Sequence, residues 1–518
     1  MMKFYLLFIS FALCGSMLFA QEDEIEAPLE YPFAETGTEV PRGVFGDDDR
    51  KEVRDAEGIE DYVRATAVMV PKTAVRGNRV YGQTLRQRLN KIYGDHPFDA
   101  DVRFLDQPTS AYCTGFLIAP DILVTAGHCI ETMEQAKNYY WIFDYTNELK
   151  YKKDTWSGYL DVDPNDIYEV AEVLDAYFQD LSTYTDYSVL RLNRKSERAP
   201  YRFRTSGEVS TYSKVSTIGS PTGLPLKYAD NAKVVDNSPE RWFKNDIDGF
   251  PGNSGGPVFN PLGFIEGIHV RGAVELQDGK YTGDYKYDYS CNCIKTVKWW
   301  STFGTAGSHA HRITKVPNDL LHRAIYENIE YAIKSRNGDR LKSWLAYSWL
   351  LDHDYTNERG RLEWAAINSD NMDALKAIMA KTETVIQDQN GRNLLFYAID
   401  NNNQSFLDYL LEKNISPDQE DNSGVSPLKY AMKRSSQRSI ETFLEAGANP
   451  YVVDSYGNNL LHWAAENGDV QFIRDLVNLG VNAGSRNYAG KRPEDIAKKA
   501  KRKSVRKLLK KARKKKRL

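Results

Sequence analysis

Four glycines recur at a constant interval in the C-terminal half of the chain. Gly391, Gly424, Gly457 and Gly490 are each 33 residues apart. Each is followed seven residues later by an alanine: Ala398, Ala431, Ala464 and Ala497. Glycine suits a turn and a small alanine suits close helix packing, so each unit is predicted to be a turn with two short helices. A unit of this size cannot bury its own apolar face, so the copies must stack into an all-α solenoid.

The repeats resemble the ankyrin family. The most specific phrases are "NNLLHWAAENGD" and "LEAGANP", and a weaker copy, "RGRLEWAAINSDNMDALKAIMAK", precedes them. The predicted ankyrin repeats span residues 356–497, after a helical linker at 318–355. Residues 498–518 are predicted to be a basic capping helix and tail, because Val505, Leu508, Leu509 and Ala512 follow helical spacing. The resemblance implies a protein partner for the repeats.

The N-terminus of the chain has the pattern of an export signal. Lys3 precedes an apolar run, and Ala20 before "QEDE" is a plausible cleavage point. We therefore expect residues 1–20 to be a signal peptide and the protein to be exported, either periplasmic or secreted. Residues 21–43 are acidic and contain prolines, and they are predicted to be a pro-segment or spacer. The chain has 518 residues, too many for one hydrophobic core, so several domains are expected.

Residues 44–317 are rich in short β-type runs. Examples are "YVRATAVMV", "TGFLIAPDILVTAG" and "GFIEGIHV", and clusters of Gly, Pro, Asn and Asp separate them. This texture predicts an all-β barrel or sandwich. Segment 76–107 is rich in Arg, Asp and Tyr without alternation, so it is predicted to be a long surface insertion.

Three polar residues of this region stand in contexts that suggest nucleophilic catalysis. They are His128 in "LVTAGHC", Asp186 in "YTDYSVLRL" and Ser254 in "GNSGGP". A serine hydroxyl needs a histidine to take its proton and a carboxylate to orient that histidine. A glycine-rich turn offers main-chain N–H groups to an oxyanion, and Gly252 and Ser254 are the expected pair. Asp175 and Asp180 compete for the carboxylate role, but Asp186 alone opens an apolar strand.

The order of these motifs resembles the trypsin/chymotrypsin-like serine endopeptidases. The resemblance implies a double β-barrel over residues 44–317, with His128 as general base, Asp186 as its orienting carboxylate and Ser254 as nucleophile. It also implies a disulfide between Cys113 and Cys129, which lie where that family carries one beside the catalytic histidine. The expected chain is therefore multidomain, an all-β double barrel followed by an all-α ankyrin solenoid.

The specificity signals conflict. Asn253 stands where the trypsin branch has an aspartate that pairs with the new N-terminus, so that activation switch is not expected in its usual form. "GVFGDDDR" and "GIHV" are more similar to the glutamyl-endopeptidase branch, in which a histidine matching His269 receives an acidic side chain of the substrate. That resemblance also implies maturation by cleavage near Arg42 or Gly43. Asp248 aligns with the acid of the trypsin pocket, which favours Lys or Arg, but it could equally cap a turn and point away. We expect Asp248, His269 and Gly272 to bind substrate, with acidic residues favoured.

The remaining cysteines leave two alternatives open. Cys291 and Cys293 in "SCNC" could form a short disulfide, and His309 and His311 nearby raise the minor alternative of a zinc site. The prediction is that the protein holds no metal and needs no cofactor.

Charge separates the tail from the body. Residues 498–518 contain 14 basic side chains and no acid, whereas residues 1–497 carry a net charge of −17. The tail could contact an anionic surface, and a nucleic-acid partner is not expected.

The leading hypothesis is a secreted serine endopeptidase acting on a protein or peptide substrate. The alternative is a catalytically silent protease fold that serves as an ankyrin adaptor or inhibitor.

Overall fold

The structure is a computed structural model of the whole chain. It describes residues 44–56, 59, 63–154, 157–179, 184–272, 276–277, 280–281, 284–299, 307–350, 361–381, 387–434 and 436–515. The predicted signal peptide at 1–20 and pro-segment at 21–43 lie outside the described residues. In the described part of the chain, no helix is long and apolar enough to cross a membrane. The chain divides into two compact units, one mostly β and the other mostly helical.

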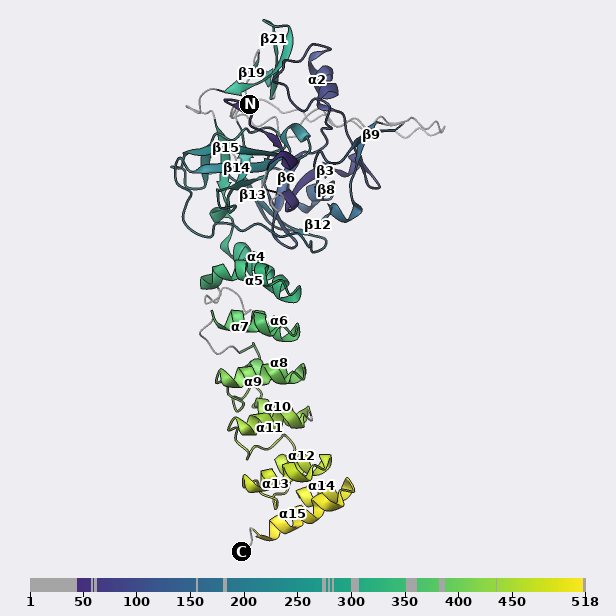
Figure 1. Cartoon of the computed structure of the whole chain (residues 1–518), viewed down its shortest axis with the longest axis vertical. Helices are drawn as coiled ribbons and strands as arrows, with labels where there is room; N and C mark the ends of the chain where they lie inside the picture. The colour runs from purple at the N-terminus through teal and green to yellow at the C-terminus, as the bar shows by residue number, and fades with distance from the viewer. Residues whose placement is uncertain are drawn as a thin grey trace, which may run out of the picture. The chain divides into compact units, whose positions relative to one another are not determined.

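The first seven-stranded sheet of the β unit has the order β11-β8-β3-β6-β7-β13-β12 (Figure 1). Its central strands are apolar on both faces, and every residue of β6 is buried. The strands are β3 (Thr66–Pro71), β6 (Cys113–Ala119), β7 (Ile122–Thr125), β8 (Tyr139–Phe143), β11 (Ile167–Tyr168), β12 (Val170–Gln179) and β13 (Thr185–Leu192).

The second sheet closes on itself. Its order is β14-β17-β18-β24-β16-β15-β2, and an additional pairing of β14 with β15 completes a ring of six strands. Its strands are β2 (Lys51–Glu52), β14 (Lys214–Gly219), β15 (Lys227–Asp236), β16 (Trp242–Asn245), β17 (Pro257–Phe259), β18 (Ile265–Arg271) and β24 (Ser308–Arg312). The predicted all-β double-barrel class is confirmed.

Smaller elements surround the sheets. The strands are β1 (Val44–Phe45), β4 (Val75–Arg76), β5 (Arg79–Tyr81), β9 (Tyr151–Lys153), β10 (Gly158–Asp161), β19 (Leu276–Gln277), β20 (Lys280–Tyr281), β21 (Tyr285–Asp288), β22 (Cys293–Thr296) and β23 (Lys298–Trp299). The helices are α2 (Leu85–Tyr93) and α3 (Met133–Ala136).

Segment 76–107, predicted to be a long surface insertion, is partly built into the core of the β unit. The segment contains α2, whose N-terminus carries a capping box formed by Thr84 and Gln87. Leu85, Leu89 and Val102 are buried and belong to one core cluster with residues from elsewhere in the β unit. The Thr-x-x-Gln spacing was the local signal for this helix.

The helical unit begins with α4 (Asn318–Lys334) and α5 (Gly338–Trp344), which lie in the predicted linker. The helical unit also contains Leu117–Leu123 from the end of β6 and the start of β7. The region is a packed part of this unit, because the buried Asn328 amide donates to the carbonyl of Ile118 at 2.6 Å. Helix pairs then follow one another along the chain (Figure 1). They are α6 (Arg361–Asn368) with α7 (Met372–Met379), α8 (Leu394–Asp400) with α9 (Gln404–Glu412), α10 (Pro427–Lys433) with α11 (Gln437–Glu445), α12 (Leu460–Asn467) with α13 (Val470–Asn478), and α14 (Pro493–Lys499) with α15 (Lys503–Lys515).

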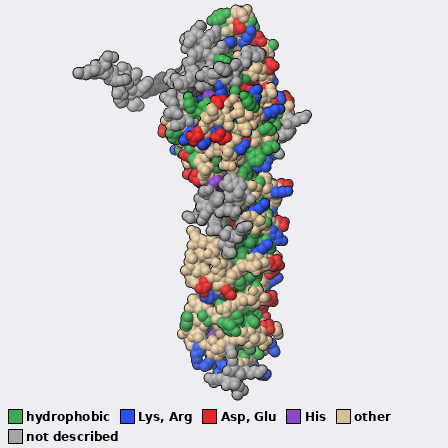
Figure 2. Space-filling model, turned by 90° about the vertical axis from the view of Figure 1, so that its left-hand side faces the viewer, with side chains coloured by type: hydrophobic (Ala, Val, Ile, Leu, Met, Phe, Trp, Pro, Cys, Tyr) green, Lys and Arg blue, Asp and Glu red, His purple; other side chains and the backbone are tan. Residues whose placement is uncertain are grey.

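The repeat glycines and alanines have the roles that the sequence predicts. The four glycines have φ between 72° and 77°, which glycine adopts without strain. The four alanines are at most 1% exposed, so the helices of a pair approach closely. In α15, Val505 and Leu509 are buried while basic side chains face solvent, and Figure 2 shows Lys and Arg side chains near this end of the unit.

Candidate active site

The first feature of the site is the pairing of His128 with Asp186. His128 follows the end of β7, and Asp186 lies on β13, the next strand of the same sheet. The Nδ1 atom of His128 lies 2.7 Å from Oδ2 of Asp186, and the main-chain N–H of His128 donates to Oδ1 at 3.1 Å. Asp186 is 1% exposed, so its charge has little solvent to screen it. Two bonds to one carboxylate fix both the loop and the ring of His128, the second of them through Nδ1.

The second feature is the turn that carries Ser254. Gly252 has a φ of 96°, and an added Cβ would lie 2.2 Å from the carbonyl oxygen of Ser220, so only glycine fits there. The N–H groups of Asn253 and Gly255 donate to the carbonyls of Phe250 and His269. Within the part of the chain that the structure describes, the N–H groups of Gly252 and Ser254 have no acceptor. This alternation of used and unused donors is what an oxyanion-binding turn requires.

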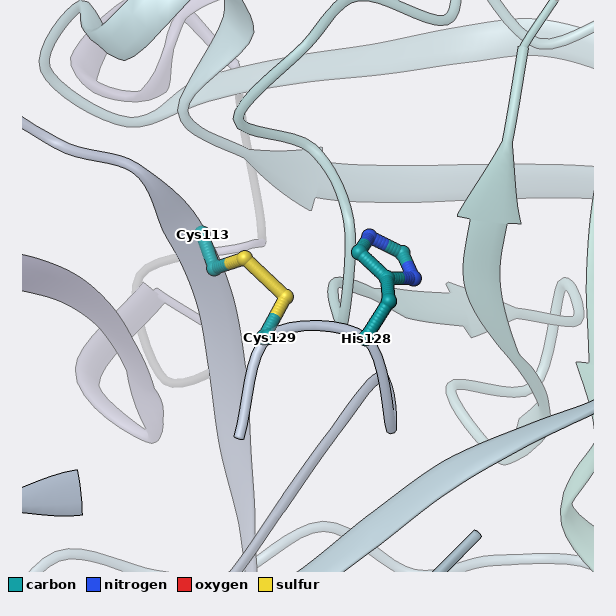
Figure 3. A group of neighbouring side chains, drawn as sticks. All are labelled: Cys113, His128 and Cys129. Carbon is teal, nitrogen blue, oxygen red and sulfur yellow. A yellow bond between two sulfur atoms is a disulfide. The ribbon is translucent and has the colours of Figure 1, made fainter. Parts of the chain in front are cut away.

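A disulfide joins the histidine loop to β6. Cys113 and Cys129 form it, which confirms the predicted pairing. Figure 3 shows the disulfide and the imidazole of His128 leaving the same short turn in different directions. Sγ of Cys129 lies 3.7 Å from the carbonyl oxygen of Ser254, and that same oxygen accepts the N–H of Thr114 at 2.8 Å. The disulfide therefore brings the His128 loop against the Ser254 turn.

Of the other acids considered for the triad, Asp175 accepts a hydrogen bond from the Tyr187 hydroxyl at 2.7 Å. Asp180 lies outside the described residues.

His128 is also in edge contact with an aromatic side chain that its sequence context did not suggest. Phe178 on β12 lies with its ring 5.8 Å from that of His128.

The three residues predicted to bind substrate occupy different surroundings. His269 is 1% exposed on β18, and its main chain bonds with Gly255 and Gly256 next to the nucleophile turn. A Cβ added at Gly249 would lie 3.1 Å from the His269 ring, so that ring lies against residue 249. Gly272 directly follows β18 and is buried.

Asp248 contacts the segment Val44–Arg50. Its Oδ1 accepts the N–H of Phe45 at 2.8 Å and its Oδ2 accepts the N–H of Asp49 at 3.2 Å. Burial raises the pKa of Asp248 well above its ordinary value, and the neighbouring charge of Asp49 adds to the effect. Both oxygens are therefore engaged by main-chain donors, as expected for the alternative in which Asp248 organises a turn.

An aromatic and basic cluster adjoins His269 and was missed at the sequence level. The guanidinium of Arg271 lies 4.9 Å from the ring centroid of Tyr184, which precedes β13 by one residue. Tyr184 contacts the edge of Trp242, and the rings of Trp242 and His309 are tilted by 30° with 4.2 Å between their centroids. The residues come from four separate stretches, so no local pattern could have grouped them.

The residues weighed for a zinc site are arranged differently. Cys291 and Cys293 form a disulfide with each other, so their sulfurs are not thiolates. His309 and His311 both lie on β24, and burial lowers their pKa values, to about 3 for His309 and to about 4 for His311. Possible ligand groups among the described residues are Cys113 with His128 and Cys129, and Asp99 with Cys291 and Cys293. Each contains a disulfide.

Comparison with known families agrees with this geometry. The trypsin-like peptidase domain family matches residues 113–268, a range that includes His128, Asp186 and Ser254 and ends one residue before His269. A family of three ankyrin repeats matches residues 362–454, and a single ankyrin repeat matches residues 456–488. The comparison with curated proteins found no match.

Proposed function

Because the chain carries a trypsin-like peptidase domain followed by ankyrin repeats, we propose that it is a serine endopeptidase. The observation that carries this proposal is the bonding of His128 to the buried Asp186, next to a turn whose Gly252 and Ser254 N–H groups lack acceptors among the described residues. Removal of any one of these parts is costly in triad hydrolases, so their joint presence favours activity over a silent fold.

The proposed reaction is acyl transfer in two steps. Ser254 Oγ attacks the scissile carbonyl carbon while His128 Nε2 takes the hydroxyl proton, and Asp186 stabilises the resulting imidazolium. The N–H groups of Gly252 and Ser254 bind the oxyanion. His128 then gives its proton to the leaving amine, and water hydrolyses the acyl-enzyme with the same base.

For specificity we propose cleavage after acidic residues. His269 lies against Gly249 near the nucleophile turn, and Arg271 follows it two residues later on the same strand. A cationic or hydrogen-bonding wall of this kind favours a carboxylate side chain. Preference for Lys or Arg would need a free acid, and both oxygens of Asp248 already accept main-chain N–H groups.

Two measurements test these statements. Ser254→Ala should abolish peptide hydrolysis while the circular dichroism spectrum stays unchanged, and full activity in the variant would refute Ser254 as the nucleophile. A peptide library digested by the unaltered enzyme should be cut after Glu or Asp. Dominant cleavage after Lys or Arg would refute the acidic preference while leaving the triad intact.

We propose further that the ankyrin repeats bind a protein partner or substrate and that the protein is exported. Export is supported by the signal-like residues 1–20 and by two disulfides, which persist in oxidising compartments. The silent adaptor is the competing function, and failure of the unaltered protein to hydrolyse any peptide of the library would favour it. Contact of the basic tail with an anionic surface stays a prediction.

A further inference from the structure

The nucleophile turn rests on the N-terminal segment Val44–Arg50. Asp248, six residues before Ser254, receives the main-chain N–H groups of Phe45 and Asp49 on its two carboxylate oxygens. Asp248 is 3% exposed, so these bonds are protected from water. A carboxylate that spans two donors of one segment fixes the position of that segment relative to the turn.

Apolar and cationic contacts reinforce this connection. Val44 and Phe250 are buried in one core cluster, and β1, which contains Val44, pairs with β23. The guanidinium of Arg50 lies 3.8 Å from the ring centroid of Phe250. Arg50 is itself held by two hydrogen bonds to the Asp48 carboxylate, at 2.8 and 2.7 Å. The segment therefore contacts residue 248 through Phe45 and Asp49, and residue 250 through Arg50.

Further hydrogen bonds connect Asp248 and Phe250 with the part of the turn that carries the Gly252 and Ser254 N–H groups. The carbonyl of Asp248 accepts the side-chain amide of Asn253 at 3.2 Å, and the carbonyl of Phe250 accepts the Asn253 N–H at 3.0 Å. The carbonyl of Gly252 accepts the Thr114 hydroxyl at 2.7 Å. These bonds hold Asn253, the residue between the Gly252 and Ser254 N–H groups, from both sides.

We propose that Asp248 is a positioning residue, which ties segment Val44–Arg50 beneath the nucleophile turn and so holds the N–H groups of Gly252 and Ser254 in the orientation that catalysis requires. The inference rests on the proposed peptidase function. Its donors are main-chain N–H groups of Phe45 and Asp49, inside the chain, so the turn is organised without a newly cut terminal amine. Cleavage near Arg42 or Gly43 is then not needed to assemble the oxyanion site.

The contacts of the Asp248 carboxyl group suggest a second, conservative substitution for the test. Asp49 and Asp248 lie side by side, and burial raises the pKa of each. Asparagine keeps one of the two bonds to the segment, since its oxygen can accept the Phe45 N–H, whereas its NH2 group cannot accept the Asp49 N–H.

The experiment compares Asp248→Ala and Asp248→Asn in the full chain without residues 1–20. Asp246→Ala is the matched control, because the carboxylate of Asp246 accepts the main-chain N–H of Lys233 on β15. We expect Asp248→Ala to lower kcat by about 10²-fold with KM nearly unchanged, as when an oxyanion donor is misplaced. Asp248→Asn, which keeps one of the two bonds, should lose less kcat than Asp248→Ala, and both variants should keep the cleavage preference of the unaltered enzyme.

Two results would overturn the proposal. One is full kcat in a folded Asp248→Ala protein. The other is a changed residue preference in Asp248→Asn, which would make Asp248 a specificity residue and is decisive even if the alanine variant does not fold. An unaltered enzyme that shows no hydrolysis and no labelling by a fluorophosphonate would instead refute the peptidase function, so the two failures are distinguishable.

Discussion

The Nδ1 atom of His128 lies 2.7 Å from Oδ2 of Asp186, and the other oxygen of that carboxylate accepts the main-chain N–H of the same histidine. One buried acid therefore sets the position of the histidine backbone and the tautomer of its ring. The loop and the ring cannot shift independently of Asp186.

Asp186→Asn should lower kcat by about 10⁴-fold with little change in KM. The amide keeps the size of the carboxylate, but it favours the wrong imidazole tautomer and cannot stabilise the imidazolium. Steady-state hydrolysis of a chromogenic peptide measures both constants. Asp175→Asn is the matched control, because Asp175 bonds to Tyr187 rather than to His128. Equal losses in the two variants would contradict the assignment.

Removing the Cys113–Cys129 disulfide with a double serine substitution should lower the free energy of unfolding by about 3 kcal/mol, given its 16-residue separation. It should also lower kcat, because Cys129 adjoins His128 and contacts the Ser254 carbonyl. The same substitutions at Cys291 and Cys293, which close a much shorter loop, should leave kcat unchanged. Urea unfolding and peptide hydrolysis on both proteins provide the comparison, and a loss of kcat in the second protein alone would contradict the role given to the first disulfide.

The two buried histidines of β24 should make the β unit sensitive to acid. The pKa of His311 is lowered to about 4 by burial and that of His309 to about 3, against an ordinary 6.5. The unfolded chain therefore binds protons below pH 6.5 that the folded chain does not, and stability falls as the pH is lowered from 6.5 towards 4. Urea unfolding at several pH values measures this effect. The free energy of unfolding of His311→Phe should fall less steeply with decreasing pH than that of the unaltered protein, by about 1 kcal/mol per pH unit. An unchanged slope would show that His311 takes up its proton in the folded state.

Alanine substitutions at two repeat glycines distinguish the cost of backbone strain from the cost of steric overlap. Gly391 and Gly424 have φ of 77° and 73°, but only at Gly391 would an added Cβ lie within 3 Å of a neighbour, Asn422. Alanine at Gly424 should cost about 1 kcal/mol for its left-handed conformation, and alanine at Gly391 should cost more. Thermal unfolding followed at the helical signal measures both. A larger effect at Gly424 would contradict the packing that the structure shows around Gly391.

The sequence predicted features that depend on local pattern or fixed spacing. The turns at Gly391 and its equivalents were readable because each repeat must provide its own turn and packing alanine. The Cys113–Cys129 pairing and the approach of His128 to Asp186 followed from a resemblance, since nothing in the intervening 57 residues fixes that distance locally.

The surroundings of Asp248 could not be read in the same way. Its partners Phe45 and Asp49 lie about 200 residues away in sequence, and only the folded β unit brings them under the nucleophile turn. The cluster of Arg271, Tyr184, Trp242 and His309 was hidden for the same reason. The helix at Leu85–Tyr93 was missed although Thr84 and Gln87 form a capping box, because charged residues obscured its short apolar stripe.

The most direct test of the account is covalent labelling of Ser254. The unaltered protein without residues 1–20 is incubated with a fluorophosphonate, and the modified residue is located by peptide mass spectrometry. His128→Ala and Ser254→Ala serve as controls. The account predicts stoichiometric modification of Ser254, a rate lowered by orders of magnitude in His128→Ala, and none in Ser254→Ala. An unaltered protein that is folded and stays unlabelled would contradict the peptidase assignment and leave the silent ankyrin adaptor.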